Sequence, residues 1–409
     1  MRYAPPATVL GIAVYLAYFD RAMPSAGAAL LKQELAIGDA RLGFAVATAA
    51  ALAYAVVATA AALIGGGPAQ RWRERAMPIG MMLWTGGAAA LAFAATWRGF
   101  VAAELAVGAG QALFVPGAAA RIANMTGGER LARASARFTL ASTAGRSSAV
   151  LIAGLIIAAI VGCGCAVPGL PADWRALFLL TALRNLAVIA MLARRRRAEP
   201  PAIADPTPEA PLRTSWPAFA GCLAIAVAPI LLIHSIGVWS PVLLVRSAGL
   251  APARAAMVAG GVTLMCAMLG QWLGGRWLDR RGARRRKPIA TIAPAIAVAG
   301  ASIAMWGAAG TGPAIAALAV ADFALGIATV ASLTAVQAIT PRHARHRGNS
   351  LFFALVTLVG VGLGPLLTGA LSDEAGADAG ALAHGIGWVA AAALLLAGAG
   401  HLQARAAMR

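Results

Sequence analysis

Long stretches with almost no charged side chains recur along this chain, and they constrain its fold more than any other feature. The first runs from Pro5 to Leu31 and is apolar, small or mildly polar except at Asp20 and Arg21. It exceeds the ~20 residues that a helix needs to cross a bilayer. Only 12% of the 409 residues are charged, whereas soluble proteins have about 25%. The sequence therefore predicts an all-α polytopic membrane protein.

Twelve such spans divide into two sets of six. They cover residues 6–30, 42–64, 76–97, 99–123, 134–161, 174–193, 216–245, 253–275, 288–309, 312–339, 349–371 and 380–402. The segment 194–215 between the sets is rich in charge and proline, which is typical of a flexible linker. We therefore expect a six-helix bundle in residues 1–193, a cytoplasmic linker in 194–215 and a second six-helix bundle in 216–409.

The net charge of +19 comes from short basic clusters that lie between spans. They fall in alternate connections, whereas the other connections hold scattered single cations and an acidic loop at Ser372 to Asp378. This asymmetry follows the positive-inside rule and does not resemble a nucleic-acid-binding face. It predicts a protein of the inner (plasma) membrane with both termini in the cytoplasm and no nucleic-acid partner.

The sequence lacks the features of an enzyme or of a metal site. Cys163 and Cys165 are too close for an ordinary disulfide, and Cys222 and Cys266 fall in expected membrane helices. No G-x-x-x-x-G-K-[ST] loop is present, which argues against ATP-driven transport. We expect no cofactor, and a proton or other ion gradient as the source of energy.

Asp20 and Arg21 lie well inside the first span, where a charge costs roughly 2.5–3.5 kcal/mol and usually faces a cavity or a partner. Adjacent residues on a helix point about 100° apart, so one side chain could face a central cavity while the other binds a neighbouring helix. The alternative is a shorter first helix from which both side chains snorkel to the membrane surface.

Five other polar or aromatic residues within spans are candidates for function. Arg146 could bind a carboxylate or phosphate, or pair with Asp20 or Glu104. Asp322 could be a proton or cation site, or the partner of an inward arginine. His234 could titrate near neutral pH or be a buried, hydrogen-bonded residue. Trp239 could line the site or belong to an interfacial belt, and Arg184 is expected to snorkel.

The loop after the second span is echoed after the eighth, about half a chain later, which indicates a repeated bundle. The later copy begins at Gly275-Arg276-Trp277-Leu278-Asp279. It resembles the G-x-L-A-D-R-x-G-R-R signature of the major facilitator superfamily, with matches at Gly275, Asp279, Arg280, Gly282 and Arg284. The resemblance implies two six-helix bundles around a central site, with this loop acting as a cytoplasmic gate. The first copy has Ala69 or Gln70 in place of the aspartate.

Other stretches resemble the spinster-like lipid transporters and, slightly less, the organic anion:cation symporters that include sialin-like carriers. They are Phe19-Asp20-Arg21, Leu42-Gly43, the helix containing Gly108, Gly110, Gln111 and Pro116, Trp239-Ser240-Pro241, Gln337 to Pro341 and Gly362 to Pro365. Both groups usually carry an arginine and a proton-binding glutamate where this chain has Glu104 and Gln111. An amide cannot titrate, so Asp20 carries the proton alone, Glu104 replaces the missing group, or proton coupling is absent.

These observations predict a monomeric secondary transporter that works by alternating access. The expected cargo is an amphipathic or organic anion, with lysolipid-like molecules favoured by the resemblance. Candidate proton-coupling residues are Asp20, Glu104 and Asp322, and candidate substrate-binding residues are Arg21, Gln111, Arg146, His234 and Trp239. The alternatives are proton-coupled uptake of a small carboxylate, drug efflux, or a non-transporting membrane sensor built on a transporter fold.

Overall fold

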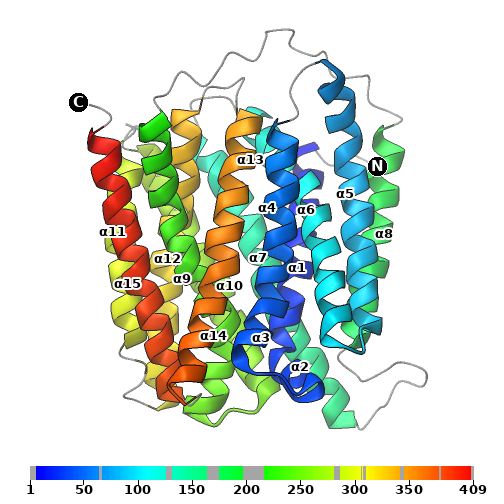
Figure 1. Cartoon of the computed structure of the whole chain (residues 1–409), viewed down its shortest axis with the longest axis vertical. Helices are drawn as coiled ribbons and strands as arrows, with labels where there is room; N and C mark the ends of the chain where they lie inside the picture. Colours follow the sequence, from blue (N-terminus) through cyan, green and yellow to red (C-terminus); the bar gives the residue numbers. More distant parts are fainter. Residues whose placement is uncertain are drawn as a thin grey trace.

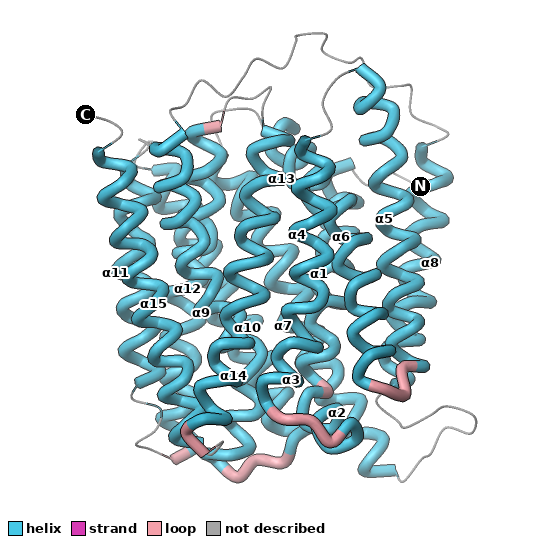
Figure 2. Tube along the Cα trace, in the orientation of Figure 1, coloured by secondary structure: helices cyan, strands magenta, loops and turns pink. Residues whose placement is uncertain are grey.

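The computed structural model describes residues 6–63, 67–125, 131–163, 175–196, 216–280, 286–304, 306, 310–340, 345–376 and 379–406. Within these ranges every regular element is a helix (Figure 2). The helices run side by side along one axis (Figure 1), so their connections gather at two ends of the molecule. We call the end where α1 begins and α15 ends the terminal end, and the other the α3/α14 end after two helices defined below.

The first half of the chain forms six passes. Its elements are α1 (Pro6–Ala26), α2 (Ala28–Leu35), α3 (Asp39–Gly43), η1 (Phe44–Thr48), α4 (Ala49–Leu63), α5 (Gly67–Phe93), α6 (Trp97–Met125), α7 (Leu131–Cys163) and α8 (Ala176–Arg196). The segments α3, η1 and α4 follow one another without a break and make a single pass. The expected helix at 6–30 is interrupted at Gly27, where a turn separates α1 from α2.

The second half forms another six passes. Its elements are α9 (Trp216–Ala248), α10 (Pro252–Arg280), α11 (Arg286–Ala304), α12 (Thr311–Ile339), α13 (Arg345–Leu355), η6 (Val356–Leu363), α14 (Gly364–Glu374) and α15 (Ala379–Ala406). Here α13, η6 and α14 make a single pass. The described residues thus contain a helical pass for each of the twelve expected spans, which confirms the predicted fold class.

Length and apolarity alone mark nine described helical runs as able to cross a membrane. Shorter apolar helices in α8 and α11 and the helix α1 account for the remaining passes. Most of the predicted linker, residues 197–215, lies outside the described residues, so the division into two bundles remains a prediction.

Two sets of helices join the two halves of the chain. On one side α7 packs along α10, and on the other the α3–η1–α4 pass meets the α13–η6–α14 pass. The segments η1 and η6 are π-helical and touch each other, and Thr48 Oγ1 donates a 2.7 Å hydrogen bond to the Gly362 carbonyl between them. Single π-helical turns inside longer helices are frequent at functional sites, so these two segments are candidate points of bending.

The α7–α10 contact depends on small residues. A Cβ atom added at Gly260 would lie 2.5 Å from the Leu151 nitrogen and 2.8 Å from the Ser147 oxygen. Membrane helices associate without a hydrophobic driving force, so they depend on close van der Waals packing. Small residues allow this packing because they let the two backbones approach. The Gln271 side chain adds a polar tie, since its Nε2 donates to Thr143 Oγ1 at 2.6 Å.

Replacing Gly260 with valine should separate α7 from α10. A new side chain there meets backbone that cannot move away, so we expect the free energy of unfolding to fall by about 1–3 kcal/mol. Thermal unfolding in detergent measures the effect. Gly261→Val is the matched control, because a Cβ at Gly261 has no atom within 4 Å. Equal unfolding midpoints for the two variants would contradict this interpretation.

Candidate functional site

A central cavity of about 70 Å³ lies between the two halves of the chain. Its charged or titratable lining comes from Tyr18 and Arg21 on α1, Arg146 on α7 and His234 on α9. A smaller cavity of about 30 Å³ shares these four side chains and reaches toward Val46 and Val238. The rest of the central cavity is lined by hydroxyl and apolar side chains: Phe138, Thr139, Ser142, Thr143, Ile230, Ile233, Thr329, Ser332, Leu333, Phe352, Phe353, Val356, Thr357 and Val361.

The charge on this lining has one sign. Both cavities take arginines from α1 and α7, and among the described residues no carboxylate lines either of them. Arg21 stands with its Cζ 5.3 Å from the centre of the Tyr54 ring. Its Nε and Nη2 atoms are buried and have no hydrogen-bond partner in the described part of the chain. The cavity therefore offers unused cationic donors within a largely apolar wall.

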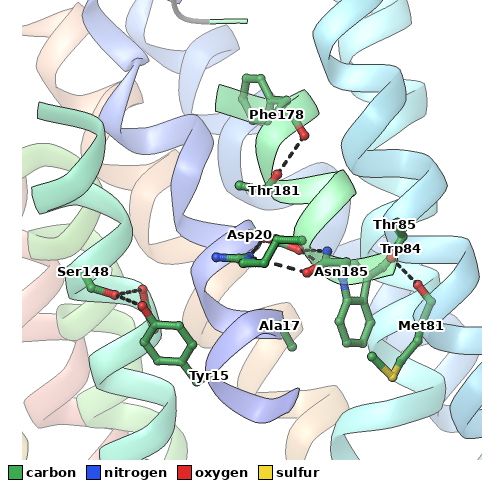
Figure 3. Close-up of polar contacts among 12 residues, drawn as sticks. Tyr15, Ala17, Asp20, Met81, Trp84, Thr85, Ser148, Phe178, Thr181 and Asn185 are labelled. Carbon is green, nitrogen blue, oxygen red and sulfur yellow. Dashed lines mark hydrogen bonds and ion pairs between the residues drawn. The ribbon is translucent and has the colours of Figure 1, made fainter. Parts of the chain in front are cut away.

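Asp20 is buried on the other side of α1, in contact with α5 and α8 (Figure 3). Its Oδ1 forms an ion pair with Arg184 and accepts a 2.6 Å hydrogen bond from Arg184 Nη2. Its Oδ2 accepts hydrogen bonds from Asn185 Nδ2 and, at 3.1 Å, from Trp84 Nε1. Asp20 is 3% exposed and Arg21 lines the central cavity, so neither snorkels as the sequence-based alternative had it. Arg184, which was expected to snorkel, pairs with Asp20.

Two more predicted site residues have structural hydrogen bonds away from the cavity. Gln111 Nε2 donates to the Ala17 carbonyl at 2.7 Å, which ties α6 to α1. Trp239 is fully buried, and its Nε1 donates to the Pro365 carbonyl at 3.0 Å. Neither side chain lines either cavity, unlike Arg21, Arg146 and His234.

The other two candidate carboxylates are also buried. Glu104 on α6 is 1% exposed, interacts electrostatically with Arg21, and has an Oε2 atom without a hydrogen-bond partner among the described residues. Asp322 on α12 accepts a 2.6 Å hydrogen bond from Thr263 Oγ1 on α10. It also interacts electrostatically with Arg146, whereas neither Asp20 nor Glu104 is among the groups that act on that guanidinium.

A charged contact joins the two halves at the α3/α14 end, and the sequence did not identify it as a site. The buried Asp39 carboxylate pairs with Lys32 at 2.5 Å and with Arg246 of α9 at 2.9 Å. Asp373 of α14 accepts hydrogen bonds from the backbone nitrogens of Asp39 and Ala40 at the start of α3. A carboxylate at a helix N-terminus is favoured by the exposed N–H groups there. The sequence feature that could have pointed to this contact is the acidic loop that contains Asp373.

The halves also touch toward the terminal end. Ser135 Oγ donates to Gln337 Oε1 at 3.1 Å, which links α7 to α12. The Phe138 ring of α7 lies 5.5 Å from the Phe353 ring of α13, centre to centre. The predicted gate residues Gly275, Asp279 and Arg280 lie at the end of α10, with Gly275 buried and Asp279 half-buried. Gly282 and Arg284 lie outside the described residues.

The model of the Major Facilitator Superfamily matches residues 10–361. Because this match covers most of the chain, the protein belongs to the Major Facilitator Superfamily. It is a multi-pass membrane protein, and its family and fold indicate a secondary transporter rather than an enzyme. No curated protein matches the chain.

Solved structures with the same fold include a bacterial homolog of the human lysosomal transporter Spinster. Its inward-facing, occupied form is 19% identical, with a TM-score of 0.72 over 98% of this chain and 96% of that one. Its inward-facing, unoccupied form is also 19% identical, with a TM-score of 0.71 over 99% and 98%. The transporter FucP in its outward conformation is 15% identical, with a TM-score of 0.65 over 97% and 99%. The fold thus resembles that of spinster-like proteins.

Removing Arg246 should favour opening at the α3/α14 end. Arg246→Ala leaves Asp39 with Lys32 alone, so we expect this end to open about tenfold more often, equivalent to about 1.4 kcal/mol. The readout is the rate at which a maleimide labels Val46→Cys, a lining residue of the smaller cavity, in a variant without native cysteines. Arg254→Ala, at an exposed position of α10, is the control. An unchanged labelling rate in Arg246→Ala would show that the contact does not hold this end closed.

Proposed function

We propose that this protein moves an organic anion across the membrane by alternating access through the central cavity. The observation that carries the proposal is the pair Arg21 and Arg146 in a cavity whose described lining contains no carboxylate. Buried donors without acceptors are costly, and an anionic group would supply acceptors to the guanidinium of Arg21. Arginine suits this role because its planar donors can bind a carboxylate or a phosphate at two points.

Two kinds of cargo are compatible with these arginines. The apolar and aromatic lining, together with the fold of the Spinster homolog, supports a lysolipid-like amphiphile whose charged head meets Arg21 and Arg146. The size of the cavity supports a second candidate, uptake of a small carboxylate. About 70 Å³ is well below the roughly 300–1,000 Å³ typical of pockets for drug-sized ligands. A lysolipid would therefore need the halves to separate further than they do here.

The two ends supply the gates that this cycle requires. The Asp39 contacts would break when the α3/α14 end opens, and the Ser135–Gln337 and Phe138–Phe353 contacts would break when the terminal end opens. In this proposal residues 1–193 and 216–409 rock against each other, and 194–215 links them. Both termini are cytoplasmic, the membrane is the inner membrane, the transporter is a monomer, and an ion gradient supplies the energy.

The first test measures thermal unfolding of the detergent-purified protein with a lysolipid panel and a small-carboxylate panel. A ligand that binds the native state at about 100 times its Kd stabilises it by about 2.7 kcal/mol and raises the unfolding midpoint. We expect Arg21→Ala and Arg146→Ala to abolish the rise. Arg137→Ala is the matched control, because Arg137 is an exposed residue of α7.

The outcome also decides between the cargoes. A rise with lysolipids alone supports the amphiphile, and a rise with small carboxylates alone supports the second candidate. A rise that survives in both arginine variants would contradict the proposed site. Flux of the same ligand into liposomes separates a transporter from a non-transporting sensor, because a sensor binds its ligand without moving it.

A further inference from the structure

We propose that Glu104 is the proton-binding group of this transporter and that Arg21 is shared between Glu104 and the bound anion. The inference rests on the proposed function, because it takes Arg21 as the anion-binding group. It starts from three helices that meet beside the central cavity. Arg21 of α1, Tyr54 of α4 and Glu104 of α6 each have at least one buried polar atom with no hydrogen-bond partner among the described residues. No other described part of the molecule combines such a carboxylate with an arginine that lines the cavity.

The three candidate carboxylates differ in what they would lose on taking up a proton. Asp20 receives donors from Arg184, Asn185 and Trp84, so protonation would sacrifice a buried ion pair. Asp322 receives a hydrogen bond from Thr263. Glu104 Oε2 accepts no hydrogen bond from any described residue, so a proton can bind there without breaking one.

Glu104 interacts with one cationic side chain, Arg21, which also lines the cavity. Of the elements packed against α6, α4 carries Tyr54 and α1 carries Tyr15, Tyr18, Asp20 and Arg21. The described charged residues of α7 are Arg146, which lines the central cavity, and the exposed Arg137. The described side chains of α5, η1 and α13 include no titratable group. Glu104 interacts electrostatically with Arg21. An anion that binds Arg21 would therefore weaken the attraction that favours the Glu104 carboxylate.

The number of buried charges also favours a proton on Glu104 when the anion is bound. Among the described charged side chains in the middle of the helices around the cavity, away from the helix ends, Arg21, Arg146 and Arg184 are matched by Asp20, Glu104 and Asp322. A monovalent anion adds one negative charge, and a proton on Glu104 Oε2 removes it. These buried charges sum to zero in the empty carrier and in the carrier that holds both the anion and the proton. A carrier that holds only one of the two buries an uncompensated charge.

This arrangement makes the anion and the proton bind cooperatively. Symport follows when the carrier moves across the membrane mainly with both bound. The proton comes from water on the loading side, binds Glu104 Oε2, and returns to water on the other side after the anion leaves Arg21. Linkage is reciprocal, so the anion must favour proton binding as much as the proton favours anion binding. A pH difference of one unit would then support up to about tenfold accumulation of a monovalent anion.

The test measures proton uptake when a probe binds the detergent-purified protein in weakly buffered solution at several values across neutral pH. The probes are lysophosphatidylglycerol and lactate, one from each cargo panel. We expect wild type to take up about one proton per bound anion at some pH in this range, and Glu104→Gln to bind the probe with no uptake. Glutamine is close in shape to a protonated glutamate, and Glu104→Asp should restore uptake. In liposomes Glu104→Gln should equilibrate the probe without accumulating it.

Asp20→Asn and Asp322→Asn distinguish this site from the other two carboxylates. Loss of proton uptake in either of them, with uptake retained in Glu104→Gln, would overturn the proposal. So would a wild type that binds a probe with no proton uptake at any pH tested, although the proposed anion transport would stand. Failure of both probes to bind wild type would instead overturn the proposed function, and this inference with it.

Discussion

The Asp20–Arg184 ion pair is the interaction on which the arrangement of the site depends. A charge within a membrane helix has no lipid group to solvate it, so it either faces a cavity or pairs with a neighbouring helix. Arg184, Asn185 and Trp84 provide that partner and join α1 to α8 and α5. Because adjacent helix residues point about 100° apart, anchoring Asp20 on this side directs Arg21 toward the cavity. The pair therefore positions the cationic side chain without itself touching the cavity.

A second constraint comes from the contact between the two halves, which must be close and yet reversible. Along α7 and α10, glycines such as Gly260 bring the backbones together, and few side chains have to rearrange when such surfaces slide. At the α3/α14 end the contact is polar, between Asp39, Arg246 and Asp373. Such ion pairs can exchange protein partners for water when that end opens. The close packing of the halves thus lies along α7 and α10, whereas the contacts that would control access to the cavity lie at the ends of the helices.

Glu104 and Gln111 show how one helix can depart from the families that it resembles. The amide of Gln111 holds the α1 backbone, a task that needs a donor and no titration. Glu104, two helical turns away on the same helix, lies buried beside the arginine that lines the cavity. A change at one position of a transporter can therefore leave the fold intact while moving the candidate ionisable group elsewhere. This is why fold similarity at 19% identity says little about coupling or cargo.

The sequence alone determined the membrane class, the twelve passes and the superfamily, because long uncharged spans and a motif such as Gly275 to Arg284 are local signals. It also indicated that Asp20 and Arg21 must face different surroundings, which follows from helix geometry. Only the tertiary structure decided their surroundings: Arg184 pairs with Asp20, and Tyr54 lies beside Arg21. Glu104 interacts electrostatically with Arg21, and Asp322 with Arg146. The Asp39 contact and the π-helical segments were likewise out of reach. The Asp39 contact depends on residues brought together from distant parts of the chain, and a hydropathy pattern records how apolar a helix is but not which neighbour it meets.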